Sequence, residues 1–397
     1  MWSIHGGARL PRIVPAAIVV IALTQCGGSP PVASGLDPAA PVAAAAVASP
    51  ASAVPAPTVV APLNIYAGTT VGAFAPQVAG IAPRVYVPNE LSGTVSVIDP
   101  ATFAVVRTIP IGPYPEHVSP SWGLTKLDVN AQGVTELDAR TGMVTRSIPV
   151  PDPYNLYFTL DGTKAIVVAE MLHRLDFYDR KTWTLLKSVP VPWAGIDHMD
   201  MSADGSYLMA TTEYTGKVVK VDTKAMAVVG TIDVGGLPID VKLAPDGTVF
   251  YVANQGRNGV SIVDPIAMRE VGFIATGRGA HGLAISRDTR SLYVSNRLEG
   301  TISVIDLATR HVSATWVVGG SPDMLTVSAD GTQLWTGNRF GSTVSVIDTA
   351  TGRVIKTIPV GRSPHGLTFF PQPGRLSLGH NGAVSYTHLT LPTILRV

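Results

Sequence analysis

Short runs of β-branched and other apolar residues recur along the chain at a nearly constant interval. The run Thr-Val-Ser-Val-Ile-Asp at residues 94–99 returns at 343–348, and with one Val→Ile change at 301–306. An aspartate ends each of seven such runs, at Asp99, Asp138, Asp179, Asp222, Asp264, Asp306 and Asp348. Successive aspartates are 39, 41, 43, 42, 42 and 42 residues apart, which is the period of a propeller blade and too long for a leucine-rich repeat. The pattern therefore predicts seven structural repeats.

Each repeat shows the same order of strands and turns. In the repeat that contains Asp264 we expect strands at 237–244, 249–253, 260–263 and 269–275, with a turn at Asp246-Gly247 and a loop at 254–258. Asp-Gly pairs supply the positive φ angles of tight hairpins, and β-branched residues suit a pleated, half-buried surface. The sequence thus predicts an all-β chain in which seven four-stranded antiparallel blades close into a propeller.

Closure of the ring leaves two arrangements open. First-strand and second-strand patterns appear once more at 365–370 and 375–379, and strand-like segments lie at 63–80, before the first clear repeat. We expect an N-terminal strand to complete a blade begun by the C-terminus. If residues 63–74 instead supply two strands, an eighth blade forms.

Three motifs carry a family resemblance. The segments Val85-Tyr-Val-Pro-Asn89, Tyr251-Val-Ala-Asn254 and Tyr293-Val-Ser-Asn296 are each followed by a strand of the Val-Ile-Asp type. They resemble the YVTN repeats of YncE-like propeller proteins, over roughly residues 82–381. The resemblance implies the fold. It implies no single activity, because that family includes binding and surface-layer proteins and resembles enzymatic propellers such as lactonases.

The N-terminus has the order of regions found in an export signal. Arg9 and Arg12 precede the apolar run 13–23, which is too short to span a bilayer comfortably. The sequence Leu-Thr-Gln-Cys-Gly at 23–27 resembles a bacterial lipobox, in which the cysteine is acylated, although Gln25 departs from the usual small residue. We expect a signal peptide at 1–26 with lipidation at Cys26. The alternative is an ordinary signal peptide with an incidental cysteine.

The remaining segments complete the expected layout. Residues 27–62 are rich in Ala, Pro, Val and Ser with almost no charge, which is typical of a flexible stalk. The propeller domain is expected at 63–382. Residues 383–397 break the repeat and resemble the translation of a sequencing adaptor rather than a natural apolar tail, so we leave them out of the fold.

Composition excludes some classes of function. Charged residues make up 14% of the chain and the formal net charge is +1, so the chain lacks the basic surface that grips nucleic acid. One cysteine allows no internal disulfide and no CxxC site. We therefore expect no nucleic-acid partner and no covalently attached cofactor.

The candidate site follows from the propeller geometry. The first strand of each blade lines the central channel, so residues where these strands begin converge at one mouth. Four of the nine histidines fall there. The candidate ligand-binding residues are Glu116, His117, Asn155, Asp197, His198, Asp240, His281, Asp323 and His365, with Tyr154 beside them.

Three chemistries are open for these residues. Imidazoles and carboxylates can bind a divalent metal, or act as general acid and base. They can also hydrogen-bond neighbouring blades and cap strand ends. No motif requires a cofactor, and a divalent metal is compatible with the residue types. Four arginines in loops, Arg278, Arg297, Arg339 and Arg362, are candidates for a basic rim.

Two functions compete on this basis. The leading hypothesis is an exported cell-envelope propeller, anchored outside the cytoplasmic membrane or secreted, that binds a small molecule, glycan or envelope protein at its channel mouth. The alternative is a lactonase-like hydrolase with His198 or His281 as base and Asp240, Asp323 or Glu116 positioning a metal or water. The fold does not choose between them, because propellers host unrelated functions.

Overall fold

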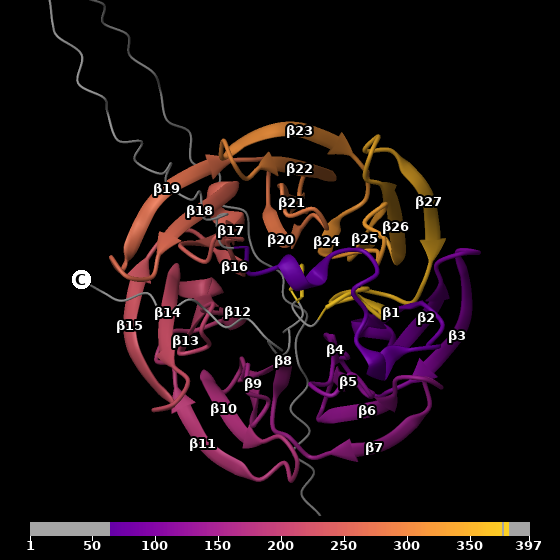
Figure 1. Ribbon diagram of the computed structural model, residues 1–397, viewed down its shortest axis with the longest axis horizontal. Coiled ribbons are helices and arrows are strands. Elements are labelled where there is room, and N and C mark those ends of the chain that lie inside the picture. Colours follow the sequence, from indigo (N-terminus) through magenta and orange to yellow (C-terminus); the bar gives the residue numbers. More distant parts are fainter. Residues whose placement is uncertain (1–63, 375–376, 381–397) are drawn as a thin grey trace, which may run out of the picture. The chain divides into compact units, whose positions relative to one another are not determined.

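Seven four-stranded sheets surround a central axis in the computed structural model, which describes residues 64–374 and 377–380. These residues belong to one compact unit within Val60–Val397. Each sheet is an antiparallel meander with its first strand near the axis and its fourth at the outside (Figure 1). The predicted seven-bladed all-β propeller is confirmed.

The strands of the first six blades follow one another along the chain. Blade 1 consists of β4 (Val118–Pro120), β5 (Lys126–Asn130), β6 (Val134–Asp138) and β7 (Val144–Ile148). Blade 2 consists of β8 (Pro153–Phe158), β9 (Lys164–Ala169), β10 (Arg174–Asp179) and β11 (Leu185–Pro190). Blade 3 consists of β12 (Ile196–Met201), β13 (Tyr207–Thr212), β14 (Lys217–Asp222) and β15 (Ala227–Asp233). Blade 4 consists of β16 (Pro238–Leu243), β17 (Phe250–Asn254), β18 (Gly259–Asp264) and β19 (Arg269–Ala275). Blade 5 consists of β20 (Ala280–Ile285), β21 (Ser291–Asn296), β22 (Thr301–Asp306) and β23 (His311–Val317). Blade 6 consists of β24 (Pro322–Val327), β25 (Gln333–Asn338), β26 (Thr343–Asp348) and β27 (Val354–Pro359).

The seventh blade joins the two ends of the propeller. Its first strand is β28 (Thr368–Phe370), which pairs antiparallel with β1 (Arg84–Asn89), followed by β2 (Thr94–Asp99) and β3 (Ala104–Pro110). This is the predicted closure. Residues 64–80 contain only two short 3-10 turns, η1 (Ala67–Thr69) and η2 (Pro76–Val78), so the alternative of an eighth blade is wrong.

The repeated aspartates each end a third strand and hold the turn that follows. The carboxylate of Asp306 accepts hydrogen bonds from the backbone N–H and the hydroxyl of Thr309, at 2.7 and 2.8 Å. These two bonds lower the pKa of the Asp306 carboxyl. Asp348 makes the same contacts with Thr351. A short acidic side chain that can bond the backbone two or three residues ahead explains why aspartate recurs at this position.

In blades 5, 6 and 7 the asparagine at the end of the second strand ties the inner hairpin together. The amide of Asn296 donates to the hydroxyls of Thr301 and Ser303, both at 2.9 Å, and Asn338 does the same with Thr343 and Ser345. Since these amides are buried, the hydroxyl partners offset the cost of removing them from water. This is the structural use of the strand-end asparagine in these three blades, whereas Asn254 bonds the backbone of Gly235 and Leu237.

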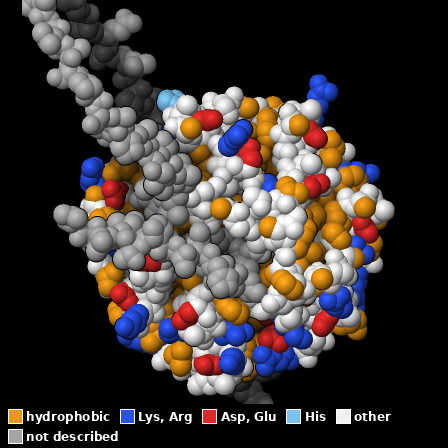
Figure 2. All heavy atoms as spheres, viewed as in Figure 1, with side chains coloured by type: hydrophobic (Ala, Val, Ile, Leu, Met, Phe, Trp, Pro, Cys, Tyr) orange, Lys and Arg blue, Asp and Glu red, His pale blue; other side chains and the backbone are white. Residues whose placement is uncertain are grey.

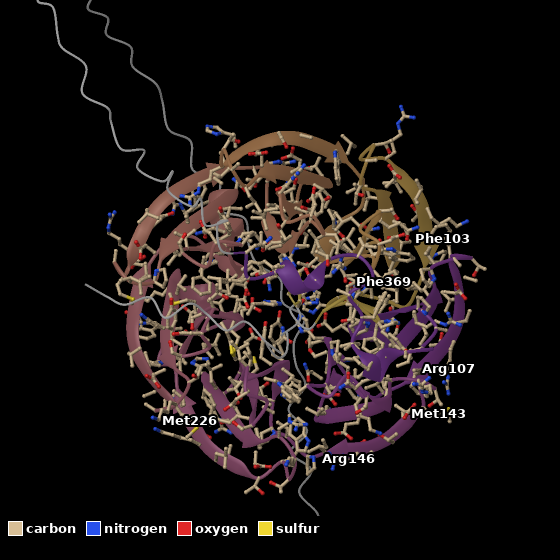
Figure 3. All side chains as sticks on the ribbon, viewed as in Figure 1. Phe103, Arg107, Met143, Arg146, Met226 and Phe369 are labelled. Atoms are coloured by element: carbon tan, nitrogen blue, oxygen red, sulfur yellow. The ribbon has the colours of Figure 1, made fainter. Side chains whose placement is uncertain are left out.

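Apolar side chains fill the spaces between blades. Trp335 of β25 is fully buried between blades 6 and 7, where its ring centroid lies 5.9 Å from Phe103 and 6.4 Å from Phe369. Figure 3 shows Phe369 nearer the axis and Phe103 at the outer side of the ring. The packing of Trp335 therefore stabilises the contact between blade 6 and the closing blade 7.

The two faces of the ring differ. We call the face where first strands begin and second strands end the funnel face, and the face of the Asp-Gly turns the turn face. The N-terminal segment 64–80 crosses the turn face, in front of the ring centre in Figure 1. Its Tyr66 hydroxyl donates to the carbonyl of Leu243, and the carbonyl of Thr69 accepts from Arg287. Figure 2 shows this face, with charged side chains scattered between apolar ones.

Residues 377–380 enter the channel from the turn face. The carbonyl of Leu378 accepts from the N–H of Ile285 at 2.6 Å, and that of Gly379 accepts from Lys242 Nζ at 3.1 Å. The expected second strand at 375–379 is therefore wrong for its described part. The reason is that β1 already occupies the place beside β28, which leaves this segment to continue along the axis.

The expected signal peptide, the stalk, Cys26 and the tail at 383–397 lie outside the described residues and stay predictions. Within the part of the chain that the structure describes, no helix has the length and apolar character needed to cross a bilayer.

Candidate functional site at the channel

The candidate residues form two tiers where the first strands begin, an upper tier at the second position of each first strand and a deeper tier at the third position. The second position of each first strand, or of the extended segment that leads into it, is occupied in chain order by Glu116, Tyr154, Asp197, Ile239, His281, Asp323 and His365. The third position carries His117, Asn155, His198, Asp240, Gly282, Met324 and Gly366. All nine predicted candidates lie in these tiers, and all of them except Glu116, that is eight, are buried.

Two histidines of the deeper tier face each other across the channel. His117 Nε2 and His198 Nε2 are 3.2 Å apart, and His117 Nδ1 lies 3.0 Å from the carbonyl oxygen of Tyr154. A carbonyl only accepts, so the proton of His117 sits on Nδ1 and its Nε2 is the acceptor. His198 must therefore donate from Nε2.

The other nitrogen of His198 contacts a carboxylate. His198 Nδ1 lies 2.6 Å from Asp197 Oδ1, out of line for a hydrogen bond, so charge rather than a directed bond holds the pair. Burial opposes a charge on His198, but the Asp197 carboxylate outweighs it and raises the pKa of His198 to about 9. At neutral pH the His198 imidazolium therefore lies between the Asp197 carboxylate of the upper tier and the neutral His117 imidazole of the deeper tier.

His365, in the upper tier, links the two ends of the ring. Its Nδ1 lies 3.0 Å from Glu116 Oε2, and its ring centroid is 4.6 Å from that of His117. Gly366 makes room for this packing, because a Cβ there would lie 2.0 Å from His117 Cδ2. Burial lowers the pKa values of His117 and His365 well below the usual range, with neighbouring cationic groups acting in the same direction. Both are neutral.

Asp323 is the centre of the upper tier. Its Oδ1 lies 3.0 Å from Arg297 and 3.1 Å from His281 Nδ1, and its Oδ2 lies 3.5 Å from Arg339 and 3.6 Å from His365 Nε2. Burial alone would favour the neutral acid, but its charged neighbours, the guanidinium of Arg297 first, lower the pKa of Asp323. Asp323 is therefore an anion held at the point where three blades meet.

The arginine contacts extend this network around the mouth. Arg297 donates to Gln255 Oε1 at 2.8 Å, and Arg339 pairs with Glu90 Oε2 at 2.5 Å. Glu90 also accepts from the hydroxyl of Ser363. Burial, and next the charge of Glu116, raise the pKa of Glu90. We call the chain Gln255–Arg297–Asp323–Arg339–Glu90 the polar arc.

The expected basic rim of four arginines is only half present. Arg297 and Arg339 belong to the polar arc. Arg278 is exposed beside Glu299 at 4.0 Å, and Arg362 donates to the carbonyl of Leu91. Loop conformation separates them, because the first pair directly follow a second strand whereas the others precede a first strand.

Two candidates have structural partners. Asp240 accepts from the backbone N–H groups of Val241 and Leu283, at 2.9 and 2.8 Å, which joins blades 4 and 5. Burial raises its pKa to about 6. Asn155 accepts from the N–H of Leu156 and donates to the Tyr157 hydroxyl. Both match the blade-capping reading of the sequence.

His380 was not anticipated. It lies in the channel segment, its ring centroid 5.3 Å from that of His117, and its carbonyl accepts from the Tyr157 hydroxyl at 3.2 Å. Burial, then the charge of His198, lower its pKa to about 3. The repeat pattern held no signal for it, because the segment lies after the last repeat. For Glu90 and Gln255 a signal existed: each directly follows a strand-end asparagine.

Exposed apolar side chains surround the polar arc. In five blades the second residue after the second strand is large and apolar: Leu91, Met171, Tyr214, Leu298 and Phe340. We call these the apolar crown. Phe340 is 72% exposed, and its ring lies 5.8 Å from the guanidinium of Arg297. Crown and arc therefore meet on the funnel face.

The residue types at the channel suit a metal, but their arrangement does not form a metal centre. Among residues 64–374 and 377–380, no group of three or more His, Cys, Asp or Glu side chains has the geometry to hold an ion. In the deeper tier each Nε2 of the His117–His198 pair is directed at the other ring.

Comparison with known proteins places this architecture in a family. The repeats and the ring define a seven-bladed β-propeller of the YVTN type. A family profile described as YNCE-like beta-propeller matches residues 32–373. The chain belongs to that family. Comparison with curated proteins gives no match.

Solved structures share the fold at low identity. The periplasmic gluconolactonase PpgL of Pseudomonas aeruginosa aligns with a TM-score of 0.61 and 19% identity over 73% of this chain and 99% of its own. A functionally unknown protein from Desulfotomaculum acetoxidans gives 0.62 and 15%, over 72% and 98%. The dihydro-heme d1 dehydrogenase NirN, in complex with DHE, gives 0.57 and 16%, over 76% and 77%. These likenesses show the fold alone.

Proposed function

We propose that this protein is a cell-envelope binding propeller whose ligand contacts the funnel face. The observation that carries the proposal is the polar arc. It spans four blades and holds five side chains in fixed positions through contacts of 2.5 to 3.5 Å. Preorganised polar groups beside exposed apolar ones are typical of a binding site, since little side-chain entropy is lost when the ligand arrives.

The hydrogen-bond pattern favours binding over catalysis. The lone pair of His117 Nε2 is directed at the proton of His198, and Asp323 is held by two arginines. A general base needs a lone pair that can reach the substrate proton. In this site the basic groups are engaged by one another.

The experiment compares ligand retention by the wild type and two variants. Purified protein is dialysed against a soluble envelope extract, and the retained compounds are identified by mass spectrometry. We expect at least one compound to be retained by the wild type and by Ile266→Ala, and about tenfold less by Phe340→Ala. Ile266 is 73% exposed on the turn face, so it matches Phe340 in exposure. Equal retention by all three proteins would refute a ligand site on the funnel face.

The envelope location rests on the N-terminal sequence. Arg9, Arg12, the apolar run 13–23 and Cys26 are arranged as in an exported lipoprotein. A lipid on Cys26 followed by the Ala/Pro stalk would hold the propeller outside the membrane. Metabolic labelling with an alkyne fatty acid should mark the wild type and not Cys26→Ser; equal labelling of both would contradict the anchor.

The hydrolase remains a second candidate because of one contact. The Asp197 carboxylate beside His198 keeps that imidazole charged, so His198 is not the base expected from the sequence but is equipped to donate a proton to a leaving group. A hydrolase predicts turnover of a δ-lactone or a p-nitrophenyl ester that is lost in His198→Gln. Turnover at the buffer rate by both proteins would remove this candidate.

A further inference from the structure

Acidic side chains outnumber cationic ones in the funnel. Four acidic side chains line it, Glu90, Glu116, Asp197 and Asp323, against three cationic ones, Arg297, Arg339 and His198. Both guanidiniums are engaged by carboxylates of the protein. An anionic ligand would have to displace Glu90 or Asp323 from its arginine, and the funnel holds no surplus positive charge to attract it.

Donors and acceptors remain beside this network. Among the described residues, Arg297 Nε is buried without a hydrogen-bond partner, and so are the side-chain oxygens of Asn296 and Asn338, the residues that precede Arg297 and Arg339. Buried polar atoms of this kind are costly unless something bonds them. The set includes both a donor and an acceptor, so its natural complement is a group that can act as either.

A hydroxyl is such a group, because it donates one hydrogen bond and accepts two without bringing charge. Carboxylate and guanidinium forks present paired atoms that match two neighbouring hydroxyls on one ring. The apolar crown supplies the other half of the contact, because Phe340 and Tyr214 offer exposed ring faces to the C–H side of such a ligand.

A docked peptide strand is a poorer match. Peptide segments commonly bind by adding a strand to an exposed sheet edge. In this ring the unpaired edge of each first strand faces the channel, part of which residues 377–380 already occupy, and the arc presents charged side chains rather than a row of backbone groups.

We propose that the funnel face binds a neutral saccharide, whose hydroxyls contact the polar arc and whose C–H face packs against Phe340 of the apolar crown. This inference rests on the proposed function and narrows its ligand to one chemical class.

The test uses an array that carries neutral oligosaccharides (maltotriose, cellotriose, chitotriose and mannotriose), trigalacturonate as the acidic counterpart, and an unrelated peptide set. Full-length wild type, Glu90→Gln, Phe340→Ala and Ile266→Ala are compared, with thermal melting as the check that each variant is folded. We expect at least one neutral trisaccharide to bind the wild type and Ile266→Ala. Its affinity should fall about tenfold or more in Glu90→Gln and in Phe340→Ala.

Four results would overturn the inference. Preferential binding of trigalacturonate would refute the charge argument. Binding of neutral sugars that is unchanged in Glu90→Gln and Phe340→Ala would place the sugar elsewhere. Peptide binding that depends on Phe340, with no sugar bound, would reject the saccharide and leave the proposed binding function standing. Absence of binding to every probe would also reject the saccharide, and if the retention experiment then shows no dependence on Phe340, the proposed function itself fails.

Discussion

Replacing Asp197 by Asn should remove the charge from His198 and change how stability depends on pH. In the wild type the pKa of His198 is about 9 against an ordinary value of 6.5. At 1.36 kcal/mol for each pH unit between them, the difference corresponds to about 3 kcal/mol of stability. Because the folded-state pKa is the higher one, this contribution is fully present below pH 6.5 and is lost as the pH rises through 9.

The assay is thermal melting of wild type and Asp197→Asn between pH 6 and pH 10. For a domain of this size about 3 kcal/mol corresponds to a melting temperature lower by roughly 5 °C. We expect that difference at pH 6 and expect it to shrink above pH 9, where His198 is neutral in both proteins. Other histidines titrate in both proteins, so their effect cancels in the comparison.

The control is Asp246→Asn, which changes an exposed carboxylate in an Asp-Gly turn. It should shift the melting temperature little and equally at all pH values. A direct measurement uses NMR of histidine Cε1–H, with the His198 signal assigned from His198→Gln. The reasoning is refuted if that signal titrates near 6.5 in the wild type, or if Asp197→Asn melts lower by the same amount at pH 6 and pH 10.

Three further predictions concern packing and acid stability. Gly366→Ala should destabilise by about 1–3 kcal/mol, because its Cβ would overlap the His117 ring, whereas Gly68→Ala, with open space around it, should be near neutral in urea unfolding. Tyr157→Phe removes the hydroxyl that bonds Asn155 and the channel segment, and should cost about 1–3 kcal/mol in the same assay. The neutral channel histidines have lowered pKa values, so stability should fall as the pH drops below 6.5; a melting temperature flat from pH 7 to pH 5 would contradict this.

The repeat pattern was sufficient to predict the ring because its residues act locally. Asp264 ends the strand that the pattern placed there, and the strands of that blade begin and end within about one residue of expectation, as local turn chemistry allows. The convergence of His117, His198 and His365 followed from the same geometry, since first strands of all blades meet at the axis.

Contacts between side chains far apart in the sequence could not be predicted from the repeat pattern. The pairing of Arg339 with Glu90 joins residues 249 positions apart and depends on loop conformation. The position of His380 depends on a segment outside the repeats, and the charge of His198 depends on how far burial is offset by Asp197. These are properties of the folded environment, so residue types alone left the chemistry of the channel open.

Because β28 closes the seventh blade, the ring can be completed only at the end of synthesis of the propeller. The edge of β1 is synthesised first, but its partner β28, at 368–370, emerges only after all six other blades. Throughout that interval the nascent chain carries an unpaired strand edge, which is a site for mistaken pairing with another chain. A chain stopped before Thr368 would keep that edge for good, so early termination should yield aggregating protein rather than a smaller propeller.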